Sequence, residues 1–144
     1  MPTIDDIGLA ERLKPHDCPH SASYWGSENA HELFPERLRE TLLDRGYAIG
    51  RTGEADYVPL AKLFTPDAGC TWLVVAIDPD NTDAAYGLAD LGLGIPELGS
   101  FSIAELTELR GAFGLPVERD LHFKAECRIG EYAERARKAG TIHA

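Results

Sequence analysis

The chain has 144 residues, 44% apolar and 26% charged, which is the size and composition of one globular domain. Its 24 acidic and 14 basic side chains give a formal net charge of −10, which argues against a broad face that grips nucleic-acid phosphates. The sequence contains no apolar run long enough for a membrane span and no secretory signal pattern. Its three cysteines include no CxxC pair, which is typical of a reducing compartment. We therefore expect a cytoplasmic protein that contacts neither membranes nor nucleic acid directly.

Residues 1–56 are predicted to form a helical and irregular extension. A short helix ends at Pro15, because the residue before a proline disfavours helical geometry. A second helix begins at Pro35 and runs to residue 44 or 45, with Gly46 as its stop. One face of this helix carries apolar residues at a spacing of four and is expected to pack against the core: Phe34, Leu38 and Leu42.

Residues 57–90 change to strand patterns. A strand is predicted over 57–64, where Pro59 indicates an edge or a bulge because proline cannot donate to a ladder. The continuous apolar run over 71–77 is typical of a strand covered on both faces. A turn cluster over 78–83 follows, and 84–90 is predicted to return antiparallel as the second strand of a hairpin.

The remaining elements alternate between loop, helix and strand. The glycine-rich segment after Asp90, as far as Gly99, is predicted to be a loop. Ser102 opens a short helix that ends at Gly111, and residues 117–123 alternate as a half-buried strand does. A last helix is predicted over 129–138. The chain is thus expected to be a single α+β domain, in which three or four mostly antiparallel strands of a 57–144 core pack against helices, with an N-terminal helical region.

Residues 63–123 resemble DUF2958, a family of small bacterial proteins of unknown function. The resemblance depends on LFTP at 63–66, DLG at 90–92, PELG at 96–99 and ERDLHF at 118–123. It implies no activity, cofactor or catalytic residue. It implies a context instead, because members occur on plasmids and other mobile elements, sometimes near genes that counter host defences.

Acidic side chains are unevenly distributed along the chain. No lysine or arginine occurs between Lys62 and Arg110, whereas eight carboxylates do: Asp67, Asp78, Asp80, Asp83, Asp90, Glu97, Glu105 and Glu108. They are either a solvated surface or a single face that meets a basic partner. The second interpretation predicts a non-enzymatic binding module whose carboxylates imitate phosphates, as an inhibitor of a nucleic-acid-binding defence complex would. Its partner is then the basic surface of another protein.

The alternative function is a small metal-assisted hydrolase. Glu118, Asp120 and His122 would project from one face of the predicted strand, with Asp90 and Glu97 arriving from the neighbouring loop. Such a set holds a divalent cation or performs general acid–base chemistry. The polar outer face of an antiparallel strand has the same pattern, so the spacing alone does not separate the two interpretations.

Two further patterns carry weaker signals. His16, Cys18 and His20 are metal-type ligands, but their spacing of two is not a common one for structural zinc, and a polar connector explains them as well. The glycines around residue 94 lack the features of a phosphate loop, because Pro96 removes a donor and Glu97 adds a negative charge. No cofactor is therefore expected.

Overall fold

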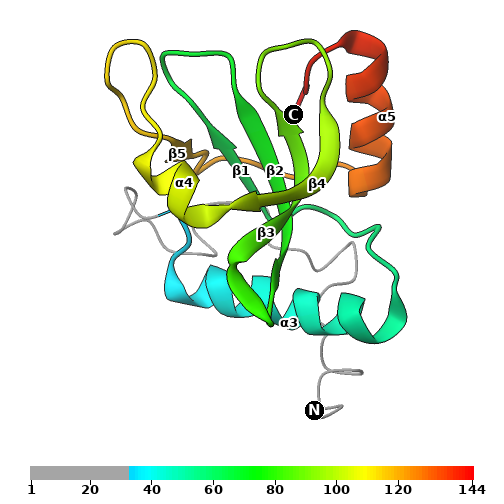
Figure 1. Ribbon diagram of the computed structural model, residues 1–144. Helices are drawn as coiled ribbons and strands as arrows, with labels where there is room; N and C mark the ends of the chain where they lie inside the picture. The colour runs from blue at the N-terminus through cyan, green and yellow to red at the C-terminus, as the bar shows by residue number, and fades with distance from the viewer. Residues whose placement is uncertain (1–32) are drawn as a thin grey trace.

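The computed structural model describes residues 33–144, which form one antiparallel sheet with helices on both faces (Figure 1). The five strands lie in the order β4-β3-β2-β1-β5, and every neighbouring pair is antiparallel. Their bounds are β1 Ala61–Phe64, β2 Thr71–Asp78, β3 Asn81–Asp90, β4 Glu97–Ser102 and β5 Glu118–Arg119. The predicted α+β class is confirmed, and the sheet has five strands where three or four were predicted.

Strand β2 lies at the centre of the sheet and is buried on both faces, as its apolar run predicts. Trp72 and Val74 belong to the core cluster beneath α3 (Glu36–Thr52). Leu73 and Val75 belong to the second cluster, beneath α5 (Ile129–Ala139). Because successive side chains of a strand point to opposite faces, the two helices cover opposite faces of the sheet.

The predicted end of the first described helix at Gly46 is wrong. Helix α3 continues to Thr52 and ends at Gly53, whose φ of 76° is the left-handed conformation that glycine adopts most readily. Gly46 serves packing instead. A Cβ placed on Gly46 would lie 1.9 Å from the carbonyl oxygen of Ile77, so the absent side chain lets α3 approach β2 closely.

Three strand predictions need correction. The strand predicted over 57–64 begins only at Ala61, after Pro59, and lies between β2 and β5 and not at the edge. The loop predicted after Asp90 contains β4, which pairs with β3 from Ala89↔Glu97 to Ala84↔Ser102. The strand predicted over 117–123 is only two residues long, because the chain turns at residues 121–122.

Two helices follow the predicted signals more closely. Helix α4 (Ile103–Glu108) is capped by Ser102, whose Oγ accepts a hydrogen bond from the Glu105 amide at 3.1 Å, although the helix ends before Gly111. Helix α5 ends at Gly140. Within residues 33–144, no helix is both long and apolar enough to cross a membrane.

Candidate acidic interaction surface

Asp83 joins the β2–β3 hairpin to helix α4. Its Oδ2 accepts a hydrogen bond from Ser102 Oγ at 2.6 Å, and its Oδ1 accepts one from the Ala104 amide at 2.8 Å. These bonds hold the pKa of the Asp83 carboxyl below its usual value, and the bond from Ser102 has the largest effect. The side chain is therefore ionised at neutral pH and fixes the start of α4 beside the hairpin.

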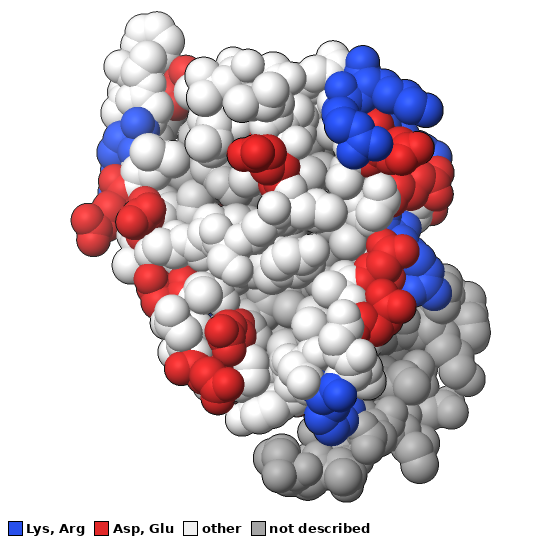
Figure 2. All heavy atoms as spheres, turned by 45° about the vertical axis from the view of Figure 1, so that its right-hand side comes forward, with Lys and Arg blue, Asp and Glu red and all other residues white. Residues whose placement is uncertain are grey.

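Four other predicted acids lie on the elements that Asp83 connects. Asp78 and Asp80 stand at the β2–β3 turn, where Asp78 Oδ1 accepts a hydrogen bond from the Asp80 amide at 2.8 Å. Glu105 and Glu108 extend from α4, and all four side chains are exposed. With Asp83 these residues form what we call the acidic strip. Figure 2 shows carboxylates down its left margin, over α4 and the hairpin.

The three other acids from the predicted binding face lie elsewhere. Asp67, in the β1–β2 loop, accepts hydrogen bonds through Oδ2 from the amides of Phe113 at 2.6 Å and Leu115 at 3.3 Å. Asp67 therefore shapes the loop before β5. Glu97 is exposed at the start of β4, at the opposite end of that strand from Asp83. Asp90 is buried, so its carboxylate is not available to a partner.

Asp90 holds the C-terminal segment against the sheet. Its Oδ2 accepts hydrogen bonds from Thr141 Oγ1 at 2.8 Å and the Ile142 amide at 3.0 Å, and its Oδ1 accepts one from the Gly92 amide at 2.9 Å. Burial by itself would raise the pKa of the Asp90 carboxyl, but the three donors together hold it below the usual value. The charge is thus stabilised inside the protein.

The residues of the hydrolase alternative do not converge. Glu97 and Glu118 lie on the two opposite edge strands of the sheet, four strand spacings or about 19 Å apart. Asp120 and His122 follow the end of β5, so they do not continue its alternation as the prediction required. The geometry expected for a shared cation site is absent from these five positions.

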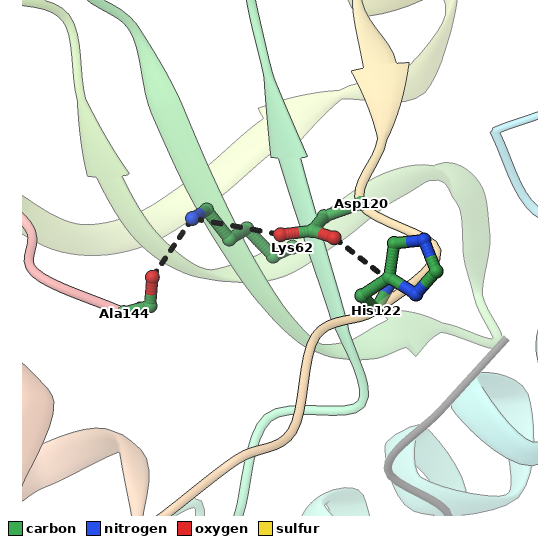
Figure 3. Close-up of polar contacts among 4 residues, drawn as sticks. All are labelled: Lys62, Asp120, His122 and Ala144. Atoms are coloured by element: carbon green, nitrogen blue, oxygen red, sulfur yellow. Dashed lines mark hydrogen bonds and ion pairs between the residues drawn. The ribbon is translucent and has the colours of Figure 1, made fainter.

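Asp120 is instead occupied by local contacts. Its Oδ1 accepts a hydrogen bond from the backbone amide of His122 at 2.8 Å, and its Oδ2 lies 3.7 Å from Lys62 Nζ. Lys62 Nζ also donates to the Ala144 carbonyl at 2.8 Å. Figure 3 shows the His122 ring on the far side of the Asp120 carboxylate from Lys62, so this group fixes a turn and the chain end.

Metal binding has no support in the described part of the chain. No group of three or more His, Cys, Asp or Glu side chains within residues 33–144 is arranged to hold a metal ion. The candidate ligands His16, Cys18 and His20 lie outside the described residues.

A shallow hollow of about 390 Å³ opens beside the start of α5. Asp56, Glu126, Cys127 and Glu131 are among its lining residues. Burial, followed by the nearby charge of Glu131, raises the pKa of the Cys127 thiol. The thiol is therefore protonated at neutral pH, which is the opposite of an activated nucleophile.

The sequence-based predictions missed an apolar surface beside β4. Leu91, Leu93 and Ile95 in the β3–β4 loop are exposed, as is Leu98 on the strand. The glycines and Pro96 of this segment indicated only a loop, and the four apolar residues among them were the available signal.

The fold and its surface define a small α+β protein with a five-stranded antiparallel sheet and an acidic strip at one end. The chain belongs to the family described as "Protein of unknown function (DUF2958)", which it matches over residues 33–143. The match extends the resemblance at 63–123 to include α3 and α5. Neither the curated proteins nor the solved structures give a match.

Proposed function

We propose that this protein is a non-enzymatic binding module that presents the acidic strip to a basic surface of another protein. The observation that carries the proposal is the pair of hydrogen bonds from Ser102 and Ala104 to Asp83. They join two stretches of acidic sequence into one end of the molecule. No lysine or arginine occurs between residues 62 and 110 to neutralise the strip from within.

The proposed partner is itself a protein that binds nucleic acid. A row of carboxylates resembles a row of phosphates in charge, so a nucleic-acid-binding effector is a suitable partner. The family resemblance, with its association with mobile elements and counter-defence, supports an inhibitor of a host defence complex. The contact consists mainly of exposed charges and is therefore screened by salt.

The proposal is tested by capturing host proteins on the immobilised full chain at low and moderate salt. The strip variant carries Asp80→Asn, Glu105→Gln and Glu108→Gln, and it keeps Asp83 because that residue has a structural role. The strip variant should capture about tenfold less of the specific partner than the unaltered protein does. Capture by the unaltered protein should also fall about tenfold when salt is raised from about 50 to 300 mM.

A matched control variant removes the same number of charges outside the strip. Glu40, Glu118 and Glu126 are exposed, and their side chains make no hydrogen bond or ion pair with the rest of residues 33–144, so each is changed to Gln. This variant should capture the same proteins as the unaltered chain. Equal losses in both triple variants, or capture that does not depend on salt, would refute the acidic strip as the binding surface.

A further inference from the structure

Strand β4 is an open edge of the sheet. It pairs only with β3, so its second row of backbone N–H and C=O groups has no strand beside it among the described residues. Proteins usually protect such an edge with lysine, proline, a bulge or a very short strand. Strand β4 spans six residues, contains neither lysine nor proline, and keeps an unbroken register with β3. The other edge, β5, has only two residues.

The β3–β4 loop that leads into this strand exposes apolar side chains, as does the strand itself. The exposed fractions are 55% for Leu91, 72% for Leu93, 66% for Ile95 and 44% for Leu98. Figure 2 shows a largely uncharged area over the middle of the view, with an acidic group in its upper part and the other charged groups at its margins. Adjacent exposed apolar side chains of this kind mark interaction sites more often than isolated ones do.

The charge around β4 is negative at both ends. Glu97 begins the strand, and Ser102 at its other end is bound to Asp83 and to the amide of Glu105. Between these ends the strand is uncharged: Leu98, Gly99, Ser100 and Phe101. A complementary strand therefore has an uncharged middle and a basic residue near each end.

We propose that β4 accepts an extended segment of the basic partner as a sixth strand. Backbone hydrogen bonds to the open edge supply affinity, and the flanking carboxylates select a segment that is basic at its ends. The inference rests on the proposed function, because it identifies how the basic partner is held. It adds the requirement that the partner's contact segment be extended.

The charges argue against a second copy of this chain as the occupant. When two β4 strands pair antiparallel, the Glu97 end of one copy lies beside the Ser102 end of the other. Glu97 of each copy would then approach Asp83 and Glu105 of its neighbour, and like charges in such a position are unfavourable. A basic segment from a different protein avoids this repulsion.

The test uses three capped, fluorescent peptides and the full chain. The parent peptide has a lysine at each end and alternating threonine and valine between them. Two analogues carry N-methyl groups, each on one of the two alternating sets of amides, so that each has one side unable to pair. All three peptides have the same charge. Strand addition predicts that one analogue binds like the parent while the other binds at least about tenfold more weakly.

A pair of variants checks the location. Ser100→Lys introduces a positive charge at the centre of β4, and Ala112→Lys introduces the same charge at an exposed loop position away from it. The first variant should weaken parent-peptide binding about tenfold, whereas the second should leave it unchanged. Amide hydrogen exchange in β4 should slow when the parent peptide binds.

Other results would overturn strand addition. Strand addition is wrong if the parent peptide does not bind, if all three peptides bind equally, or if both analogues bind equally weakly. It is also wrong if the free protein is a dimer in which the β4 amides are protected from exchange. Failure here with preserved, strip-dependent capture of host proteins would leave the proposed function standing. Loss of that capture in both triple variants would remove the proposed function itself.

Discussion

The contact between α3 and β2 leaves no room for a side chain at Gly46. A Cβ there would lie 1.9 Å from the Ile77 carbonyl oxygen and 2.9 Å from Pro79 Cδ, whereas ordinary contacts begin at 3.4 Å. Gly46→Ala therefore requires a displacement of 3.4 − 1.9 = 1.5 Å between two backbone segments. Backbone cannot rotate away as a flexible side chain does, so the substitution must destabilise the fold.

The size of the effect follows from two opposing contributions. Overpacking of this kind costs about 3 kcal/mol, and alanine's better helix propensity returns about 1 kcal/mol. We expect Gly46→Ala to lower the free energy of unfolding by about 2 kcal/mol. Urea denaturation followed by circular dichroism measures it, and a slope of about 2 kcal/mol per molar predicts a midpoint about 1 M lower.

Gly50, one turn later in α3, supplies the matched control. Nothing in the described part of the chain lies within 4 Å of a Cβ placed at Gly50. Gly50→Ala should therefore raise the free energy of unfolding by about 1 kcal/mol, through helix propensity alone. A Gly46→Ala variant as stable as the unaltered protein, or the same sign for both variants, would refute the close-packing explanation.

Three further substitutions test the contacts of buried and structural carboxylates. Asp90→Asn should lower the free energy of unfolding by about 2 kcal/mol at pH 7. Because folding lowers the pKa of Asp90, the stabilisation by its charge is present above the unfolded pKa of about 4 and is lost as pH falls through the folded pKa. In urea titrations, the difference in unfolding free energy between the unaltered protein and the variant should therefore be smaller at pH 3 than at pH 7. Asp67→Ala releases the amide of Phe113, so chymotrypsin should cleave after this residue several-fold faster, with the Asp67→Asn variant intermediate. Asp56→Ala removes the carboxylate that accepts from the Gly130 amide at the start of α5, which should cost about 1 kcal/mol by urea denaturation.

Local patterns predicted the elements whose signals are continuous. The apolar run of β2 and the amphipathic face of α5 each contain enough residues to specify an element and its buried side. Strand β4 was missed because ELGSFS has only two apolar residues and becomes a strand by pairing with β3. The strand predicted over 117–123 was too long because the Asp120 carboxylate accepts a hydrogen bond from the His122 amide. This local bond forms a turn in competition with strand pairing.

The composition of the acidic strip could be predicted from the sequence, but its geometry could not. The absence of lysine and arginine between residues 62 and 110 identified the segment. Which carboxylates share a surface depends on the contact between Asp83 and Ser102, residues on paired strands whose side chains meet only in the folded chain. The burial of Asp90 gave no distinctive signal, because its donors Thr141 and Ile142 are distant in sequence.

The number of acidic residues between residues 62 and 110 consequently overstates the negative charge that one exposed surface carries. Asp90 is buried, and Asp67 orders a loop, so these two carboxylates stabilise the fold and do not add to the exposed acidic strip. Glu97 is separated from the acidic strip by the length of β4. The same separation gives β4 its negative ends and uncharged middle, which a uniform acidic face would lack. In the proposed strand addition, this arrangement favours a partner segment with basic groups at a defined spacing over one that is merely basic, because only the former meets both ends of the strand.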